Sequence, residues 1–155
     1  MGLPIVPLRV AEELDCSKHY FDFKKRCVYC DIIESELSMD TRVIRETEHF
    51  VSIAPYASRS CFEIWVLPKR HRAHYFKADD RELSDLAGMM KDSITRLNSA
   101  LGYPSYNYMI HTAPVKAGDL EHFHWHIEIL PRVKAMAGIE WGSGIDINPT
   151  LPEEA

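Results

Sequence analysis

The sequence predicts one α+β domain in which an antiparallel sheet carries a long helix on one face and a short helix precedes the sheet. The chain has 155 residues, 46% hydrophobic and 26% charged, which is typical of a single globular domain. The predicted elements follow in the order β-β-β-α-β-β, with too little helix between strands for a parallel sheet. Apolar residues at steps of three and four predict the long helix: Leu83, Leu86, Met90, Ile94, Leu97 and Leu101.

The elements are predicted in chain order from local signals. Residues 1–10 form an extended arm, because Pro4 and Pro7 prevent regular pairing. A short helix over residues 11–20 completes this N-terminal arm (1–20), and the domain proper covers residues 21–155. Asp79 or Asp80 caps the long helix, which ends at Gly102 and Pro104. One or two helical turns are expected over 31–37, and strands over 41–46, 50–53, 61–67, 106–110 and 123–130.

Charge and composition exclude several function classes. The net charge of −5 with a pI of 5.9 argues against a protein that binds a nucleic acid polymer. No apolar run approaches the ~20 residues of a membrane span, so no membrane partner is expected. Pro4, Pro7 and Arg9 occupy the stretch where a signal peptide is apolar, which predicts a cytoplasmic protein. An anionic small molecule remains compatible, because a few local cations can hold one phosphate.

Residues 122–129 alternate strictly between histidine or acidic side chains and apolar ones. In a strand, His122, His124, His126 and Glu128 would share one face. Phe123, Trp125, Ile127 and Ile129 would share the other face and pack on the long helix. A solvated polar face is one interpretation of the three histidines, and metal binding or nucleophilic catalysis is the other.

Cys27 and Cys30 form a C-x-x-C pair, which in a chain without a secretory signal favours metal ligands or a redox dithiol. A redox role is disfavoured, because the parallel βαβ context of thioredoxin-type pairs is not predicted here. Zinc requires four nitrogen or sulfur ligands in a closed structural site. The histidines that can complete such a site are His71, His74, His111 and His122.

Catalysis at phosphorus is the second chemistry that the histidines support. An unprotonated imidazole nitrogen can attack phosphorus while the other nitrogen is held by an acceptor. Asn107, Thr112, Lys116 and the backbone around Gly118 lie on the segment leading to the histidine strand, where they can contact phosphate oxygens. Glu128 is a further candidate, as an acceptor that orients a ring or a bound substrate.

The segment 138–149 is too rich in apolar residues to be a free tail. It carries Ile139, Trp141, Ile145 and Ile147 among three glycines. We expect it to pack against a partner subunit or the sheet edge.

The sequence resembles a known superfamily at several motifs. H-F-H-W-H-I-E-I-L-P-R (122–132) is similar to the H-φ-H-φ-H motif of the histidine triad (HIT) superfamily. C-V-Y-C-D-I-I-E-S-E (27–36) looks like the zinc-binding start of many members. Other segments look like the C-terminal half of galactose-1-phosphate uridylyltransferase and its nucleotidyltransferase relatives: P-Y-A-S-R (55–59), E-I-W-V-L-P-K-R-H (63–71), Y-N-Y-M-I-H-T-A-P (106–114) and I-N-P-T-L-P-E-E-A (147–155).

The resemblance implies a HIT fold that commonly pairs into dimers, with zinc as cofactor and a nucleotide or nucleotide sugar as substrate. The residues that match the zinc ligands are Cys27, Cys30, His71 and His122. His124 matches the position of the nucleophile, with His126 beside it as a second catalytic residue. The transferase relatives work through a nucleotidyl-histidine intermediate and pass the nucleotide to a sugar phosphate.

One feature departs from the full-length transferases, and another matches their C-terminal half. Their catalytic histidine lies in a His-Pro-His-Gln type motif of the N-terminal half, and this sequence contains no such motif. Their C-terminal half contributes a second metal site, and His111, His126 and Glu128 match its positions. The sequence therefore supports a HIT-type nucleotidyl transferase or hydrolase acting on a nucleoside 5′-phosphate ester. A non-catalytic nucleotide- and metal-binding half of a larger transferase is the alternative, and a zinc-stabilised dimerisation module is a third interpretation.

Overall fold

The computed structural model describes residues 5–133 and 138–155. Residues 1–4 of the expected arm lie outside the described residues. The elements in chain order are α1 (Leu8–Lys24), α2 (Val28–Met39), β1 (Val43–Glu46), β2 (Phe50–Ile53), β3 (Ile64–Pro68), the 3-10 turn η1 (Tyr75–Lys77), α3 (Asp80–Leu101), β4 (Tyr106–His111), β5 (His126–Pro131), α4 (Gly138–Ser143) and the 3-10 turn η2 (Pro152–Glu154). No helix among the described residues is long and apolar enough to cross a membrane.

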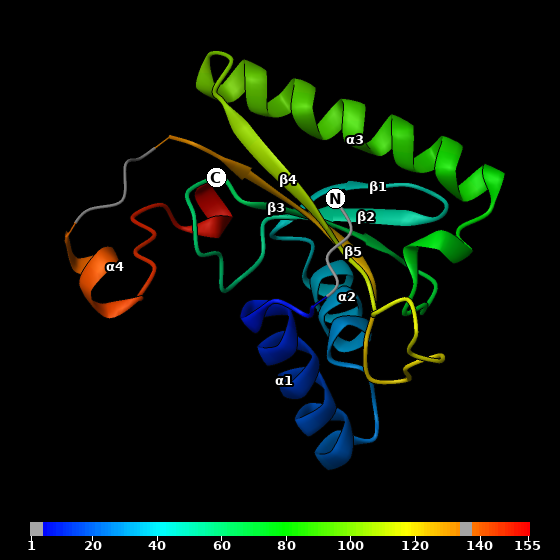
Figure 1. Cartoon of the computed structure of the whole chain (residues 1–155). Coiled ribbons are helices and arrows are strands. Elements are labelled where there is room, and N and C mark those ends of the chain that lie inside the picture. The colour runs from blue at the N-terminus through cyan, green and yellow to red at the C-terminus, as the bar shows by residue number, and fades with distance from the viewer. Residues whose placement is uncertain (1–4, 134–137) are drawn as a thin grey trace.

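The five strands form one sheet in the order β1-β2-β3-β5-β4, and every neighbouring pair is antiparallel. Helix α3 lies along one face of this sheet, while α1 and α2 lie on the opposite side (Figure 1). The predicted α+β class with an antiparallel sheet and one long packed helix is therefore confirmed. Strand β4 forms one edge of the sheet, next to β5.

Each face of the sheet has its own apolar core. Toward α3, Trp125, Ile127 and Ile129 pack with Leu86 and Met89. Toward α2, the core residues include Cys27, Tyr29, Ile33, Val51, Ile53, Leu67 and Phe123. Burial of one large side chain contributes roughly 1.5–3 kcal/mol, so both layers hold the sheet firmly.

Helix α3 begins and ends where the sequence predicts. The Asp79 carboxylate accepts hydrogen bonds from the backbone N–H groups of Arg81 and Glu82, and the Glu82 side chain accepts from the Asp79 N–H in return. At the other end, Gly102 adopts a left-handed conformation with φ of 67°, which glycine adopts without strain.

The N-terminal prediction was wrong in its helix boundaries. Helix α1 begins at Leu8 directly after Pro7 and continues to Lys24, so the boundary expected at residue 20 falls inside it. Proline is tolerated at the start of a helix, where its missing N–H has no intrahelical partner. Helix α2 is also longer than the turns expected over 31–37.

The histidine segment does not form the strand predicted from Phe123. Strand β5 starts at His126, because the N–H of Phe123 donates to the Leu120 carbonyl and that of Trp125 to the Arg72 carbonyl, outside the ladder. The strict alternation of faces is therefore lost before His126. Phe123 packs on the α2 side rather than on α3.

Candidate functional site

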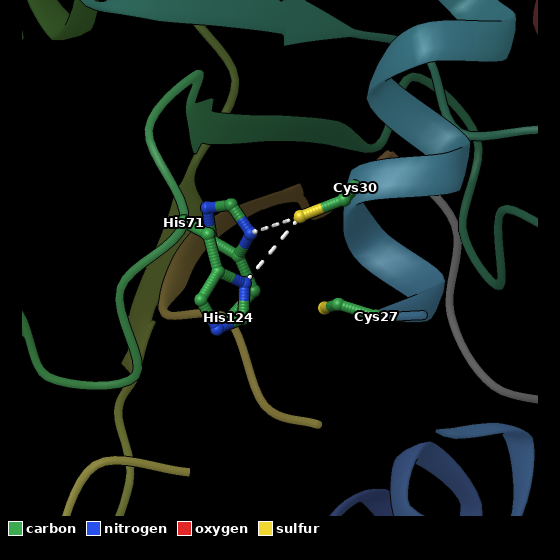
Figure 2. Close-up of side chains that lie close together, drawn as sticks. All are labelled: Cys27, Cys30, His71 and His124. Carbon is green, nitrogen blue, oxygen red and sulfur yellow. Dashed lines mark hydrogen bonds between the residues drawn. The ribbon is translucent and has the colours of Figure 1, made fainter. Parts of the chain in front are cut away.

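Four side chains converge on one point at the start of α2. We call them the sulfur–histidine group: Cys27, Cys30, His71 and His124, whose ligand atoms all lie within 4.8 Å of one another. Figure 2 shows the two cysteines projecting from the first turn of α2 toward the two facing imidazole rings. His71 follows β3 and His124 precedes β5, so three separate segments of the chain meet here.

The distances in this group match a tetrahedral zinc site. The Cys30 Sγ atom lies 3.4 Å from His71 Nδ1 and 3.5 Å from His124 Nδ1. Zinc–sulfur bonds of about 2.3 Å and zinc–nitrogen bonds of about 2.0–2.1 Å place tetrahedral ligand atoms roughly 3.6 Å apart. The donor set therefore fits zinc in both chemistry and spacing.

Both histidines present Nδ1 to the cysteines, and the backbone determines this choice for His124. Its Nε2 lies 2.9 Å from the Pro68 carbonyl oxygen. Since a carbonyl can only accept, Nε2 carries the proton and Nδ1 keeps its lone pair. His71 likewise hydrogen bonds to the backbone of Leu120. Hydrogen bonds of this kind fix the ring orientation of metal-binding histidines.

The electrostatics favour a thiolate in this group. A hydrogen bond from Cys30 lowers the pKa of Cys27, against the opposing effect of burial. The pKa of Cys30 is raised, chiefly because it donates to Cys27. The hydrogen bond to Cys27 in turn raises the pKa of His71. One negative charge is thus already stable at the sulfurs, and a cation would favour the second.

The structure brings together three of the four expected metal ligands, and His124 stands where His122 was expected. His122 contributes its backbone carbonyl, whose oxygen lies 3.8 Å from Cys27 Sγ, while its ring lies near that of Phe21. The cause is the late start of β5, which turns His124 toward the cysteines. His74, another open candidate, is buried elsewhere, with its Nε2 at 3.1 Å from the Gly118 carbonyl oxygen.

A second group of side chains includes His126, which follows His124 of the first group by two residues. We call it the carboxylate–histidine group: Glu13, Arg59, His111, His126 and Glu128. His111 Nδ1 lies 2.7 Å from Glu13 and its Nε2 lies 3.2 Å from Glu128. Arg59 forms an ion pair with Glu128. Opposing carboxylates raise the pKa of His111 to about 9, although burial acts against this.

His126 is enclosed within this group and is not open to a substrate. Its ring is packed against those of Tyr29, Trp65 and His111, with centroid distances of 4.8, 5.3 and 4.7 Å. Its Nδ1 donates to the His124 carbonyl oxygen at 3.0 Å. Burial lowers the pKa of His126 to about 4, so the ring is neutral at physiological pH. His124 is also fully buried.

The residues expected to contact the substrate have different surroundings in the structure. Asn107 is exposed on β4. The Thr112 hydroxyl accepts from the Tyr75 N–H, and the Gly118 carbonyl accepts from His74, so both fasten the loop after β4 onto η1 and the residue before it. Glu128 belongs to the carboxylate–histidine group.

Two members of the second group were missed by the sequence analysis. Glu13 lies on α1, in the segment expected to be part of an arm, and Arg59 lies on the loop after β2. No local spacing connects either residue to His111, since the contacts are made across 98 residues for Glu13 and 69 residues between Arg59 and Glu128. The signals were the charge of each residue and, for Arg59, its place at the end of the P-Y-A-S-R segment.

Comparison of this chain with known proteins defines its family. The galactose-1-phosphate uridyl transferase C-terminal domain family matches residues 13–139. The chain belongs to this family, within the HIT superfamily. A HIT family protein from Bacillus anthracis shares the fold, with a TM-score of 0.54 at 19% identity over 75% of this chain and 84% of that chain.

Two longer relatives match nearly all of this chain. An ADP-glucose phosphorylase from Arabidopsis thaliana, solved with bound ADP-glucose, is 40% identical with a TM-score of 0.88, over 97% of this chain and 48% of that chain. A galactose-1-phosphate uridylyltransferase from Thermotoga maritima is 30% identical over 99% of this chain and 50% of its own length. The chain thus spans about half the length of the curated relatives that it matches.

Proposed function

We propose that this chain acts in nucleotidyl transfer as a zinc-stabilised, HIT-like domain that binds a nucleotide sugar or a related nucleoside 5′-phosphate ester. The observation that carries the proposal is the sulfur–histidine group on a fold of the uridyl transferase C-terminal family. The named substrates of two relatives, ADP-glucose and galactose 1-phosphate, support a nucleotide-sugar reaction.

Zinc would be held by Cys27, Cys30, His71 and His124. All four ligand positions are filled by protein, so the metal would serve as a structural cross-link rather than an open Lewis acid. It would tie the start of α2 to the segments after β3 and before β5. The Pro68 carbonyl holds the His124 ring in the orientation that this role requires.

The proposed reaction of the whole enzyme proceeds through a nucleotidyl-histidine intermediate. A histidine nitrogen attacks the α-phosphorus, the sugar phosphate leaves, and a phosphate, a sugar phosphate or water then accepts the nucleotide. We propose that neither His124 nor His126 is this nucleophile. The Nδ1 lone pair of His124 faces the cysteines, and His126 is enclosed by three rings. This favours the alternative of a nucleotide- and metal-binding half over self-sufficient catalysis by the triad.

Mass spectrometry combined with a binding assay tests this function. The zinc-loaded chain is incubated with ADP-glucose or UDP-glucose, and binding is followed by the shift in its thermal unfolding midpoint. We expect a nucleotide-dependent increase in the midpoint, and no nucleotidyl adduct on His124 or His126 in the intact-mass and peptide spectra. Absence of any binding to either nucleotide sugar would overturn the substrate class. An adduct mapped to His124 or His126 would instead overturn the assignment of their roles.

We also propose that a second copy of this chain covers the exposed apolar segment around α4. Ile139, Trp141 and Ile145 are 58%, 75% and 63% exposed, an unfavourable arrangement for large side chains in water. Figure 1 shows α4 standing away from the sheet. Sedimentation equilibrium should give a dimer, and Trp141→Ser should shift it toward monomer. A monomer with a protease-sensitive C-terminal segment would contradict this proposal.

A further inference from the structure

The resemblance to the transferases implies a second metal site, and the carboxylate–histidine group contains the residues that match it. Histidine and carboxylate side chains are suitable ligands for a divalent cation. Glu13, His111 and His126 also bring their ligand atoms within 4.8 Å of one another. The donor types therefore permit a metal, and the decision rests on their hydrogen bonds and charges.

His111 offers no free lone pair to a metal. Its Nδ1 lies 2.7 Å from Glu13 Oε2 and its Nε2 lies 3.2 Å from Glu128 Oε2. An ionised carboxylate can only accept a hydrogen bond, so both ring nitrogens act as donors. A ring that donates at both nitrogens is an imidazolium, and its single positive charge already balances one of the two carboxylates that would bind the metal.

Arg59 supplies a second internal cation at the same place. Its guanidinium contacts the Glu128 carboxylate, which is the one that also accepts from His111. Arg59 lies 3.6 Å from Glu63 as well. The Glu63 carboxylate is buried, but it accepts from the Trp65 indole and from the N–H groups of Arg59 and Ser60. The contacts with Glu63 and Glu128 therefore hold the Arg59 side chain beside the Glu128 carboxylate.

The charges alternate along a continuous path: Glu13 is negative, His111 positive, Glu128 negative and Arg59 positive. The path begins on α1 and crosses β4 and β5 to the loop after β2. A divalent cation would have to enter beside two cations in a half-buried place, where repulsion is weakly screened. The Tyr29 hydroxyl completes the set by donating to Glu13 at 2.6 Å.

We propose that Arg59 and the imidazolium of His111 take the place of a second metal, and that this ion chain fastens α1 to the sheet without one. The sulfur–histidine group is then the only metal site among the described residues. In this proposal, Arg59 determines which cation occupies the group. The inference stands independently of the nucleotidyl-transfer proposal.

Cobalt(II) titration of the metal-free chain and of an Arg59→Gln variant tests the inference. Thiolate coordination gives intense near-ultraviolet absorption, whereas a carboxylate and histidine site does not, so the two groups can be counted separately. We expect the unmodified chain to bind one Co²⁺ with the thiolate signature. Arg59→Gln should bind a second Co²⁺ without additional thiolate absorption, with at least tenfold higher affinity than any second event in the unmodified chain.

Arg81→Gln is the matched control, because Arg81 is exposed on α3 and far from the group in sequence. It should retain the one-cobalt behaviour. Two equivalents bound tightly by the unmodified chain would overturn the inference, as would a folded Arg59→Gln variant that behaves like Arg81→Gln. If Arg59→Gln does not fold, ¹⁵N NMR of the unmodified chain decides. Two protonated His111 ring nitrogens at neutral pH support the ion chain, and a neutral-imidazole pattern contradicts it.

Discussion

His124 and His126 lie two residues apart, yet they belong to groups with opposite electrostatic designs. The sulfur–histidine group contains sulfurs and imidazole nitrogens that converge, with no arginine or lysine among its four members. In the carboxylate–histidine group, the acidic Glu13 and Glu128 are already paired with the basic His111 and Arg59. The first group would need a cation to satisfy its donors, and the second already has its own.

The difference shows that a donor inventory alone does not define a metal site. Both groups bring histidines within ligand distance of anionic side chains. In one of them, the backbone carbonyl of Pro68 directs the His124 lone pair toward the cysteines. In the carboxylate–histidine group, both ring nitrogens of His111 donate to carboxylates. The hydrogen bonds around a ring therefore decide whether it is a ligand or a charged partner.

The largest expected effect comes from disrupting the proposed zinc site. Cys27→Ser should abolish zinc binding and lower the thermal unfolding midpoint sharply, because structural zinc contributes on the order of 10 kcal/mol of binding free energy in small sites. Elemental analysis and calorimetry measure the two effects. Cys16→Ser is the control, since Cys16 is exposed on α1 and should have no influence. Equal zinc content in both variants would contradict the proposed ligand set.

The next effect separates two neighbouring histidines. His124→Gln should lose zinc and unfold more easily, because it removes a ligand. His122→Gln should retain one zinc per chain, since only the backbone of His122 contacts the group. Zinc content and urea unfolding of the two variants give the comparison. The opposite result would restore His122 as the ligand that the sequence resemblance implies.

A smaller loss is expected from breaking the ion chain. Glu13→Gln leaves His111 with one carboxylate instead of two and should reduce the free energy of unfolding by on the order of 3 kcal/mol. Glu12→Gln makes the same change on an exposed position of α1 and should alter stability by less than about 0.5 kcal/mol. Zinc content should be unchanged in both. A zinc loss specific to Glu13→Gln would contradict the separation of the two groups.

The smallest effect is a pH dependence carried by His111. Its pKa is raised to about 9 from an ordinary 6.5, so its contribution is complete below pH 6.5 and is lost as pH rises through 9. The facing Glu13 and Glu128 have lowered pKa values, so their contributions are lost only in acid. The buried His126 ring stacks on the His111 ring, while Tyr29 contacts Glu13 and Arg59 contacts Glu128. The loss between pH 7 and 9 should be about 2 kcal/mol.

Urea unfolding at a series of pH values measures this loss. A His111→Gln variant has no imidazolium at this position, so its stability should be flatter over the same interval. Identical slopes for the variant and the unmodified chain would show that another group titrates there.

Much of the fold followed from local patterns in the sequence. The apolar spacing of α3, its Asp79 cap and the strands β1, β2 and β4 depend on neighbouring residues, and the structure confirms them. The start of β5 did not follow, because it depends on contacts with Leu120 and Arg72. Because β5 starts later than predicted, His124 lies outside the strand, and His124 rather than His122 faces the cysteines.

The candidate site was predictable only where its residues are close in sequence. The C-x-x-C spacing predicted the two sulfur ligands, and the family resemblance indicated His71. Glu13 carries no such signal, and the P-Y-A-S-R segment gives Arg59 no partner, because each residue reaches its partner through tertiary packing of α1 and of the loop after β2. Whether His111 is a ligand or an imidazolium depends on those two partners.

Anomalous X-ray diffraction at the zinc absorption edge tests the central claim most directly. Crystals of the chain grown with excess zinc would reveal every ordered zinc ion as a peak at a definite position. We predict one strong peak among Cys27, Cys30, His71 and His124, and none among Glu13, His111, His126 and Glu128. A peak in the second group, or an empty first group, would contradict the account.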